Sequence, residues 1–180
     1  MLKFLALVLA LAALDAGAAC AQSQPYGSLK DRPIKALSAD EVANLQAGRG
    51  LGMALPAELN RYPGPAHVLE NAAALGLTPE QRAAVSGQFD TMHSEAVALG
   101  ERIIAKEMVL DALFKAGGAD AGSIDRLTAE LGAFYGELRA VHLRTHLATK
   151  ATLTETQLAM YETLRGYDAN GAAQAPVHKH

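Results

Sequence analysis

The feature that most constrains this chain is an unbroken apolar repeat within residues 77–113. Apolar side chains recur there at alternating steps of four and three, with one lysine among them. The series is Val85, Phe89, Met92, Ala96, Leu99, Ile103, Lys106, Leu110 and Leu113. This spacing predicts one long amphipathic helix with a heptad seam. At roughly 1.5 Å per residue the helix is a rod of about 50 Å, which needs a partner to cover its seam.

A second apolar seam supplies that partner. Gly117 and Gly118 predict a turn, and Ser123 is expected to cap the helix that follows. The second seam is Ile124, Leu127, Leu131, Phe134, Leu138, Val141, Thr145 and Ala148. Folding the chain at the glycines brings Leu99 opposite Leu138 in an antiparallel pair. We therefore expect an all-α fold built on a long antiparallel helical hairpin with short flanking helices.

Capping and chain-breaking patterns predict the flanking helices. Ser38 and Glu41 have the spacing of a capping box, and the glycines within residues 48–52 end the helix that it starts. The expected flanking helices cover residues 39–46, 53–59, 67–75 and 155–164.

The beginning of the chain has the pattern of a secretory signal. An apolar run from Phe4 to Leu14 is followed by small residues, with a cleavage site expected after Ala21. The mature chain would then contain no cysteine, which suits a helical protein of the bacterial periplasm. A lipid anchor on Cys20 is the minor alternative. We expect a signal peptide at 1–21, a flexible leader at 22–37, a helical domain at 38–166 and a disordered tail at 167–180.

The composition and the absence of known catalytic motifs argue against two classes of function. The chain is half apolar, has no tryptophan and carries a net charge of −3 without a basic run, so nucleic acid is not an expected partner. It has no glycine-rich phosphate loop, no Gly-x-Ser-x-Gly and no His-Glu-x-x-His, so we do not expect an enzyme. Two long helices with short additions leave one face of the rod uncovered, which favours a homodimer.

One short motif occurs at both ends of the hairpin. Leu77-Thr78-Pro79-Glu80-Gln81 precedes the first long helix, and Leu153-Thr154-Glu155-Thr156-Gln157 precedes the last helix. In each motif the threonine can cap the helix while the glutamine three residues later closes a capping box. Plain capping is therefore one sufficient explanation for Thr78, Gln81, Thr154 and Gln157.

Two Leu-Thr-x-x-Gln motifs around a helical hairpin, behind a signal peptide, resemble the Spy/CpxP family of periplasmic proteins. This group includes zinc-resistance-associated proteins and CnrX-type heavy-metal sensors. The resemblance implies a cradle-like homodimer with no required cofactor. It implies ATP-independent chaperoning of unfolded envelope proteins in the stress response or, as the alternative, heavy-metal sensing that signals to a membrane-bound regulatory partner.

Histidines supply the candidate metal site. His142 and His146 are four residues apart, which places two imidazoles on one face of a helix. The hairpin register brings Asp90 and His93 alongside them, and the preceding short helix is expected to deliver His67. Such a set suits Zn²⁺, or Ni²⁺ or Co²⁺. CnrX-type sensors resemble this layout, although Asn71 stands where their second ligand would be. The alternative is that these histidines are half-buried polar residues beside the seam.

Overall fold

The computed structural model describes residues 26–167 of the chain. The expected signal peptide and residues 168–180 of the expected tail lie outside the described residues. The chain divides into two compact units, residues 1–30 and residues 31–180. The described part of the first unit contains one short 3-10 helix, η1 (Gly27–Leu29). All the α-helices described below belong to the second unit.

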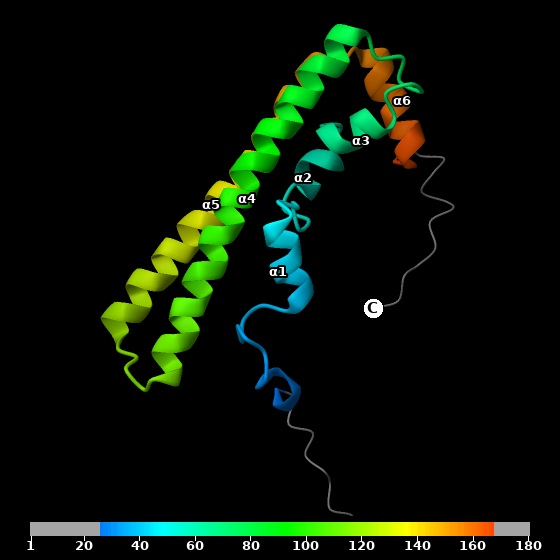
Figure 1. Ribbon diagram of the computed structural model, residues 1–180. Coiled ribbons are helices and arrows are strands. Elements are labelled where there is room, and N and C mark those ends of the chain that lie inside the picture. The colour runs from blue at the N-terminus through cyan, green and yellow to red at the C-terminus, as the bar shows by residue number, and fades with distance from the viewer. Residues whose placement is uncertain (1–25, 168–180) are drawn as a thin grey trace, which may run out of the picture. The chain divides into compact units, whose positions relative to one another are not determined.

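The second unit is all-α, as the sequence predicts, and no strand occurs within residues 26–167. Figure 1 shows the long hairpin with the shorter helices beside it. The helices are α1 (Ala39–Gln46), α2 (Leu55–Glu58), α3 (Pro65–Glu70), α4 (Pro79–Lys115), α5 (Ala121–Thr152) and α6 (Glu155–Arg165). Within the described part of the chain, none of these helices is long and apolar enough to cross a membrane.

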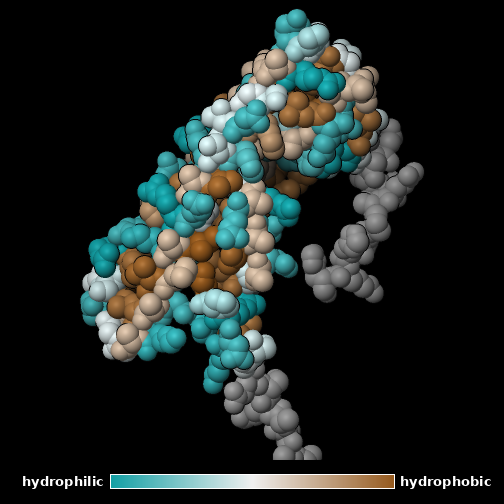
Figure 2. Space-filling view, viewed as in Figure 1, coloured by the Kyte–Doolittle hydropathy of each residue, from teal (hydrophilic) through white to brown (hydrophobic). Residues whose placement is uncertain are grey.

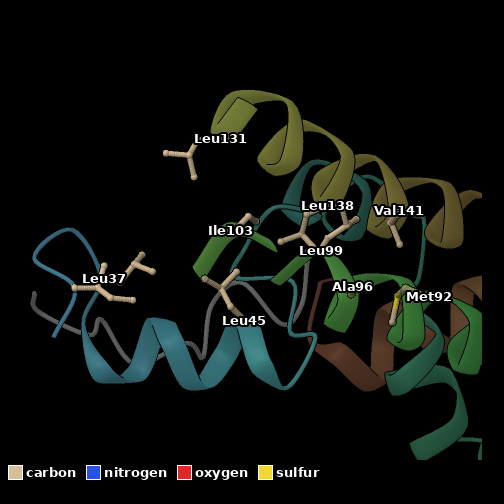
Figure 3. Packing of buried hydrophobic residues seen from close by; sticks show 10 residues of the cluster. Leu37, Leu45, Met92, Ala96, Leu99, Ile103, Leu131, Leu138 and Val141 are labelled. Carbon is tan, nitrogen blue, oxygen red and sulfur yellow. The ribbon is translucent and has the colours of Figure 1, made fainter. Parts of the chain in front are cut away.

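Helices α4 and α5 pack along one another in the predicted register. Leu99 and Leu138 are both buried and lie together in the core (Figure 3). Lys106 forms an ion pair with Glu130 across the hairpin, close to the level that the seams predict. The cap of α5 corrects the sequence prediction. Asp120, not Ser123, is the N-cap, because an Asp120 side-chain oxygen accepts from the Ser123 backbone N–H at 3.0 Å.

Helix α1 and the residues before it cover the middle of the hairpin. Leu45 of α1 is buried in the same core, together with Ile34 and Leu37 from the preceding segment. The packed structure therefore begins before residue 38, within the stretch that the sequence predicts as a leader. The backbone of Leu45 passes directly over Gly100 of α4, where a side chain would not fit.

Helix α3 is shorter than predicted and begins earlier, at Pro65 rather than His67. Proline suits the first helical position because no N–H is needed there. The helix ends at Glu70, where the side-chain amide of Asn71 donates to the His67 carbonyl oxygen at 2.8 Å. Turns then connect α3 to α4. Val68 of α3 and Tyr161 of α6 belong to a second apolar cluster at this end of the hairpin.

The two Leu-Thr-x-x-Gln motifs form the predicted capping boxes and also bind each other. Thr78 and Thr154 are the N-caps of α4 and α6, with Gln81 and Gln157 completing the boxes. The two glutamine side chains then exchange a pair of amide hydrogen bonds, each 2.9 Å long. Gln81 also donates to the Thr152 carbonyl oxygen at the end of α5. Capping is therefore only part of their role, since the pair ties α6 to the open end of the hairpin.

Candidate metal centre

Four histidines line one pocket between the hairpin and the shorter helices. The pocket encloses about 580 Å³ and is bounded by the loop of residues 48–52, α2, α3 and the inner face of the hairpin. Its histidines are His67 of α3, His93 of α4, and His142 and His146 of α5. These are four of the five residues that the sequence predicts for a metal site. The fifth, Asp90, is exposed and is not among the residues that line the pocket.

His142 is the most deeply buried of the four, with 4% of its surface exposed. Its Nε2 atom is buried and has no hydrogen-bond partner. Burial, and to a lesser extent the neighbouring His146, lowers the pKa of His142 below its ordinary value. The ring is therefore neutral at physiological pH, with an uncompensated polar nitrogen. A neutral imidazole is the form that binds a metal ion.

His146 is held in an orientation that leaves one nitrogen available. Its Nδ1 lies 2.7 Å from the carbonyl oxygen of Tyr62, which can only accept a hydrogen bond. Nδ1 therefore carries a proton that it donates to this oxygen, so a metal ion bound by this ring would bind through Nε2. A backbone carbonyl in this role is a common way to orient a metal-binding histidine.

His67 and His93 stand at the margin of the pocket and are more exposed than the α5 pair. His67 Nδ1 lies 2.9 Å from a carboxylate oxygen of Glu70 in the same helix, which leaves Nε2 for another partner. The ring of His93 stacks on Phe89, with ring centroids 5.8 Å apart. Both residues therefore present an imidazole ring to the edge of the pocket.

The carboxylate of the pocket is Glu58, which the sequence analysis missed. Only 8% of Glu58 is exposed. One of its oxygens accepts from the Gly64 backbone N–H at 3.0 Å and lies 3.7 Å from His146 Nδ1. The other accepts from Tyr161 at 2.5 Å and from Tyr167 at 3.3 Å, and Arg165 Nε lies 3.5 Å away. Glu58 lies in no recognisable sequence motif. Its burial is what marks it as a candidate functional residue, and that burial is known only from the fold.

The backbone of Gly64, directly before α3, packs closely against the ring of His146. A Cβ placed on Gly64 would lie 3.1 Å from His146 Nε2 and 3.6 Å from the Glu58 oxygen that binds the Gly64 N–H. Gly64 therefore contacts both the imidazole of His146 and the carboxylate of Glu58. Nitrogen and oxygen donors of these types suit a divalent transition metal.

The donors line one pocket but are not arranged as a coordination shell. Within residues 26–167, no three His, Cys, Asp or Glu side chains lie close enough together to hold a metal ion. The orphaned Nε2 of His142, the free Nε2 of His146 and the nearby Glu58 nevertheless fit the chemistry of such an ion. A complete site requires that at least one of these groups move.

Comparison of the chain with protein-family models, with curated proteins and with solved structures finds no match in any of the three.

Proposed function

We propose that this chain is a Spy/CpxP-like envelope-stress protein of the periplasm that binds a divalent transition-metal ion in the histidine pocket. The observation that carries the proposal is the state of the two α5 histidines. His142 is buried, neutral and unpartnered at Nε2, while His146 is oriented by the Tyr62 carbonyl with its own Nε2 free. Burying an unpartnered polar atom costs about 1–3 kcal/mol. A ligand that pairs with His142 Nε2 would remove this cost, which favours its binding.

The residues assigned to the ion are His142 and His146, with His67 and His93 as the further imidazoles within the pocket. Zn²⁺, Ni²⁺ and Co²⁺ are the candidate ions because imidazole nitrogens suit all three. The ion would link α5 to the elements opposite it. A metal ion binds the neutral form of imidazole, so the affinity for the ion should fall as the pH is lowered.

Calorimetric titration of the mature protein with Zn²⁺ tests this proposal. The expected result is one site per chain that is lost in the double variant His142→Ala/His146→Ala. The matched control is His178→Ala/His180→Ala, which removes the two histidines of the C-terminal tail and should leave the site intact. Binding that survives the first variant and disappears in the second would place the metal on the tail and refute the pocket.

For the activity itself we propose ATP-independent holding of unfolded envelope proteins. Apolar side chains exposed on the long helices support it, since they offer contact area without a fixed partner. Met108, Val109 and Phe114 of α4 and Leu147 of α5 are each about half exposed. Apolar surface is interspersed with hydrophilic side chains along the molecule in Figure 2. A holdase suppresses aggregation of a chemically denatured client without ATP, and Phe114→Ser with Val109→Ser should weaken that effect.

The second candidate activity is metal sensing, in which the chain signals to a membrane-bound partner. The observation that favours it is the position of Glu58, which contacts both the histidine pocket and α6. Loss of aggregation suppression in a protein that still binds Zn²⁺ would favour sensing over holding. In either case we propose a homodimer, and sedimentation that gives a stable monomer at micromolar concentration would refute it.

A further inference from the structure

We propose that the histidine pocket binds a small aromatic carboxylate that also carries a hydroxyl group. This binding is independent of the proposed metal binding, because it depends on the apolar walls of the pocket and on two polar groups among its lining residues. The pocket volume of about 580 Å³ lies within the range of about 300–1,000 Å³ that is typical of small-molecule sites. Most of the lining residues are apolar or glycine, which is also typical of such sites.

Apolar side chains from the loop, α2 and α4 give the pocket walls that suit an aromatic ring. Leu51 of the loop and Leu55 of α2 are 38% and 52% exposed. Phe89 of α4 stacks on His93 with only 7° between the ring planes, and both rings line the pocket. An aromatic ligand would cover the exposed leucines and add a further aromatic contact, and both effects favour binding.

The backbone of Leu51 has a conformation that leucine rarely adopts. Its φ is +48°, in the left-handed region that favours glycine. The neighbouring residues Gly50 and Gly52 are glycines, yet a leucine occupies the strained position between them. Leu51 belongs to neither apolar cluster of the core, so core packing does not explain its side chain. Strained residues concentrate at ligand-binding sites, and a role as a wall of the pocket accounts for this one.

Arg49 is the group that would bind the carboxylate. It lines the pocket and is exposed, and none of the salt bridges within residues 26–167 involves it. Its Nη1 donates to the side-chain oxygen of Asn44 at 2.9 Å, which orients the guanidinium group and leaves its other N–H groups for a ligand. A guanidinium group binds a carboxylate through two parallel hydrogen bonds.

The charge of Glu58 directs the carboxylate of the ligand toward Arg49. Glu58 also lines the pocket, and its oxygens already accept from the Gly64 backbone N–H and from the Tyr161 hydroxyl. Arg165 Nε lies 3.5 Å from one of these oxygens. Because like charges repel, a second carboxylate beside Glu58 is unfavourable. The carboxylate is therefore expected at Arg49 and not beside Glu58.

His146 supplies the acceptor for the hydroxyl group of the ligand. Its Nδ1 donates to the Tyr62 carbonyl oxygen, so in the neutral ring the lone pair is on Nε2. This Nε2 makes no hydrogen bond within the described part of the chain and, unlike Nε2 of His142, it is not fully buried. A ligand hydroxyl can therefore donate to it, whereas a carboxylate has no proton to donate.

Calorimetric titration with three related compounds tests the ligand class. The full mature chain is used without metal at about pH 8, where an ordinary imidazole is neutral. We expect para-coumarate to bind at one site per chain. Cinnamate, which lacks the hydroxyl, should bind about fivefold more weakly, and para-coumaryl alcohol, which lacks the carboxylate, about tenfold more weakly. Equal affinities for the three compounds, or no binding of para-coumarate, would overturn the inference and leave the proposed metal binding standing.

Arg49→Gln tests the carboxylate contact. We expect the affinity for para-coumarate to fall about tenfold and the affinity for para-coumaryl alcohol to stay unchanged, because only the first compound has a carboxylate. The matched control is Arg82→Gln, which replaces an exposed arginine of α4 outside the pocket lining and should change neither affinity. An equal loss for both compounds would show that Arg49 only supports the loop, and would overturn its assignment.

Leu51→Gly separates a role in binding from a role in the fold. Glycine adopts the left-handed conformation without strain, so Tm should not fall. The apolar wall is lost, so the affinity for para-coumarate should fall about fivefold or more. Arg61→Gly is the control for affinity, because Arg61 also has a positive φ, of +66°, and lies outside the pocket lining. Unchanged affinity in Leu51→Gly would refute the proposed wall.

A last variant tests whether the compound binds in the pocket or on exposed apolar surface elsewhere. Val109 and Phe114 of α4 are about half exposed and lie outside the pocket lining. Val109→Ser with Phe114→Ser should therefore leave the affinity for para-coumarate unchanged. Loss of binding in this double variant would place the compound on the surface of α4 and overturn the inference.

Discussion

Gly100 should be the least replaceable glycine in the long helices. Glycine in a helix interior is normally unfavourable, and replacing it with alanine stabilises a helix by about 1 kcal/mol. At Gly100, however, a Cβ would lie 2.7 Å from the carbonyl carbon of Leu45 and closer still to its oxygen. The obstacle is backbone at the end of α1, so no change of side-chain rotamer can relieve it.

Gly100→Ala should lower the stability of the protein because the new methyl group pushes α1 away from α4. Moving α1 away from α4 loosens the packing of Leu45, which is 1% exposed, and of Ile34 and Leu37 in the preceding segment. Fully burying one such side chain is worth about 1.5–3 kcal/mol, and overpacking a core costs about 1–3 kcal/mol. After subtracting about 1 kcal/mol of gained helix propensity, a net loss of roughly 2 kcal/mol is expected. For a domain of this size that lowers Tm by about 4–8 °C.

Gly87→Ala is the matched control for Gly100→Ala. Gly87 lies in the same helix, is exposed, and has nothing within 4 Å of the position that a Cβ would take. The same substitution there should raise Tm by about 2–4 °C. Thermal unfolding followed by far-ultraviolet circular dichroism compares the two variants. If Gly100→Ala is as stable as Gly87→Ala, then α1 does not pack against α4 at this point and the reasoning is refuted.

Three further predictions concern the core, the motif pair and pH. Leu99→Asp should cost several kcal/mol in urea unfolding, because it buries an unpaired charge beside Leu138. Gln81→Ala and Gln157→Ala should each cost about 1–2 kcal/mol, and the double variant should cost less than their sum because the two amides bind each other. Since burial lowers the pKa of His142, the unfolded chain takes up a proton first as the pH falls through about 6.5. Metal-free protein should therefore lose stability below that pH, and His142→Leu should make the loss shallower in unfolding curves recorded with a chelator present.

The hairpin could be predicted because its signals are local and repeated. Seam positions such as Leu99 and Leu138 recur over many turns, and the glycines between the helices fix the turn, so the register follows from the sequence alone. The capping boxes at Thr78 and Thr154 are equally local. Ile34 and Leu37 carry no such periodicity, and their burial depends on a surface that exists only once the hairpin has formed.

The candidate site was predicted in part, for a related reason. Hairpin register determines which residues share a level along the long axis, and it correctly brings His93 near the level of His142 and His146. It does not determine which side of the hairpin the shorter helices cover. They cover the side that carries His93, while Asp90 remains exposed to solvent. Glu58 belongs to a helix of four residues and reaches the pocket only through that tertiary packing.

Glycines that look like chain breakers in the sequence have a second role around the pocket. A Cβ on Gly48 would lie 3.1 Å from His93 Nδ1, and one on Gly64 would lie 3.0 Å from Cε1 of His146. The backbone at these points therefore passes as close to the imidazole rings as a glycine allows. Candidate histidines can be identified in a sequence from their chemistry and spacing. A pocket wall formed by glycine backbone appears in the sequence only as a glycine, which is equally typical of a turn. The pocket could therefore be recognised only after the helices had been placed against one another.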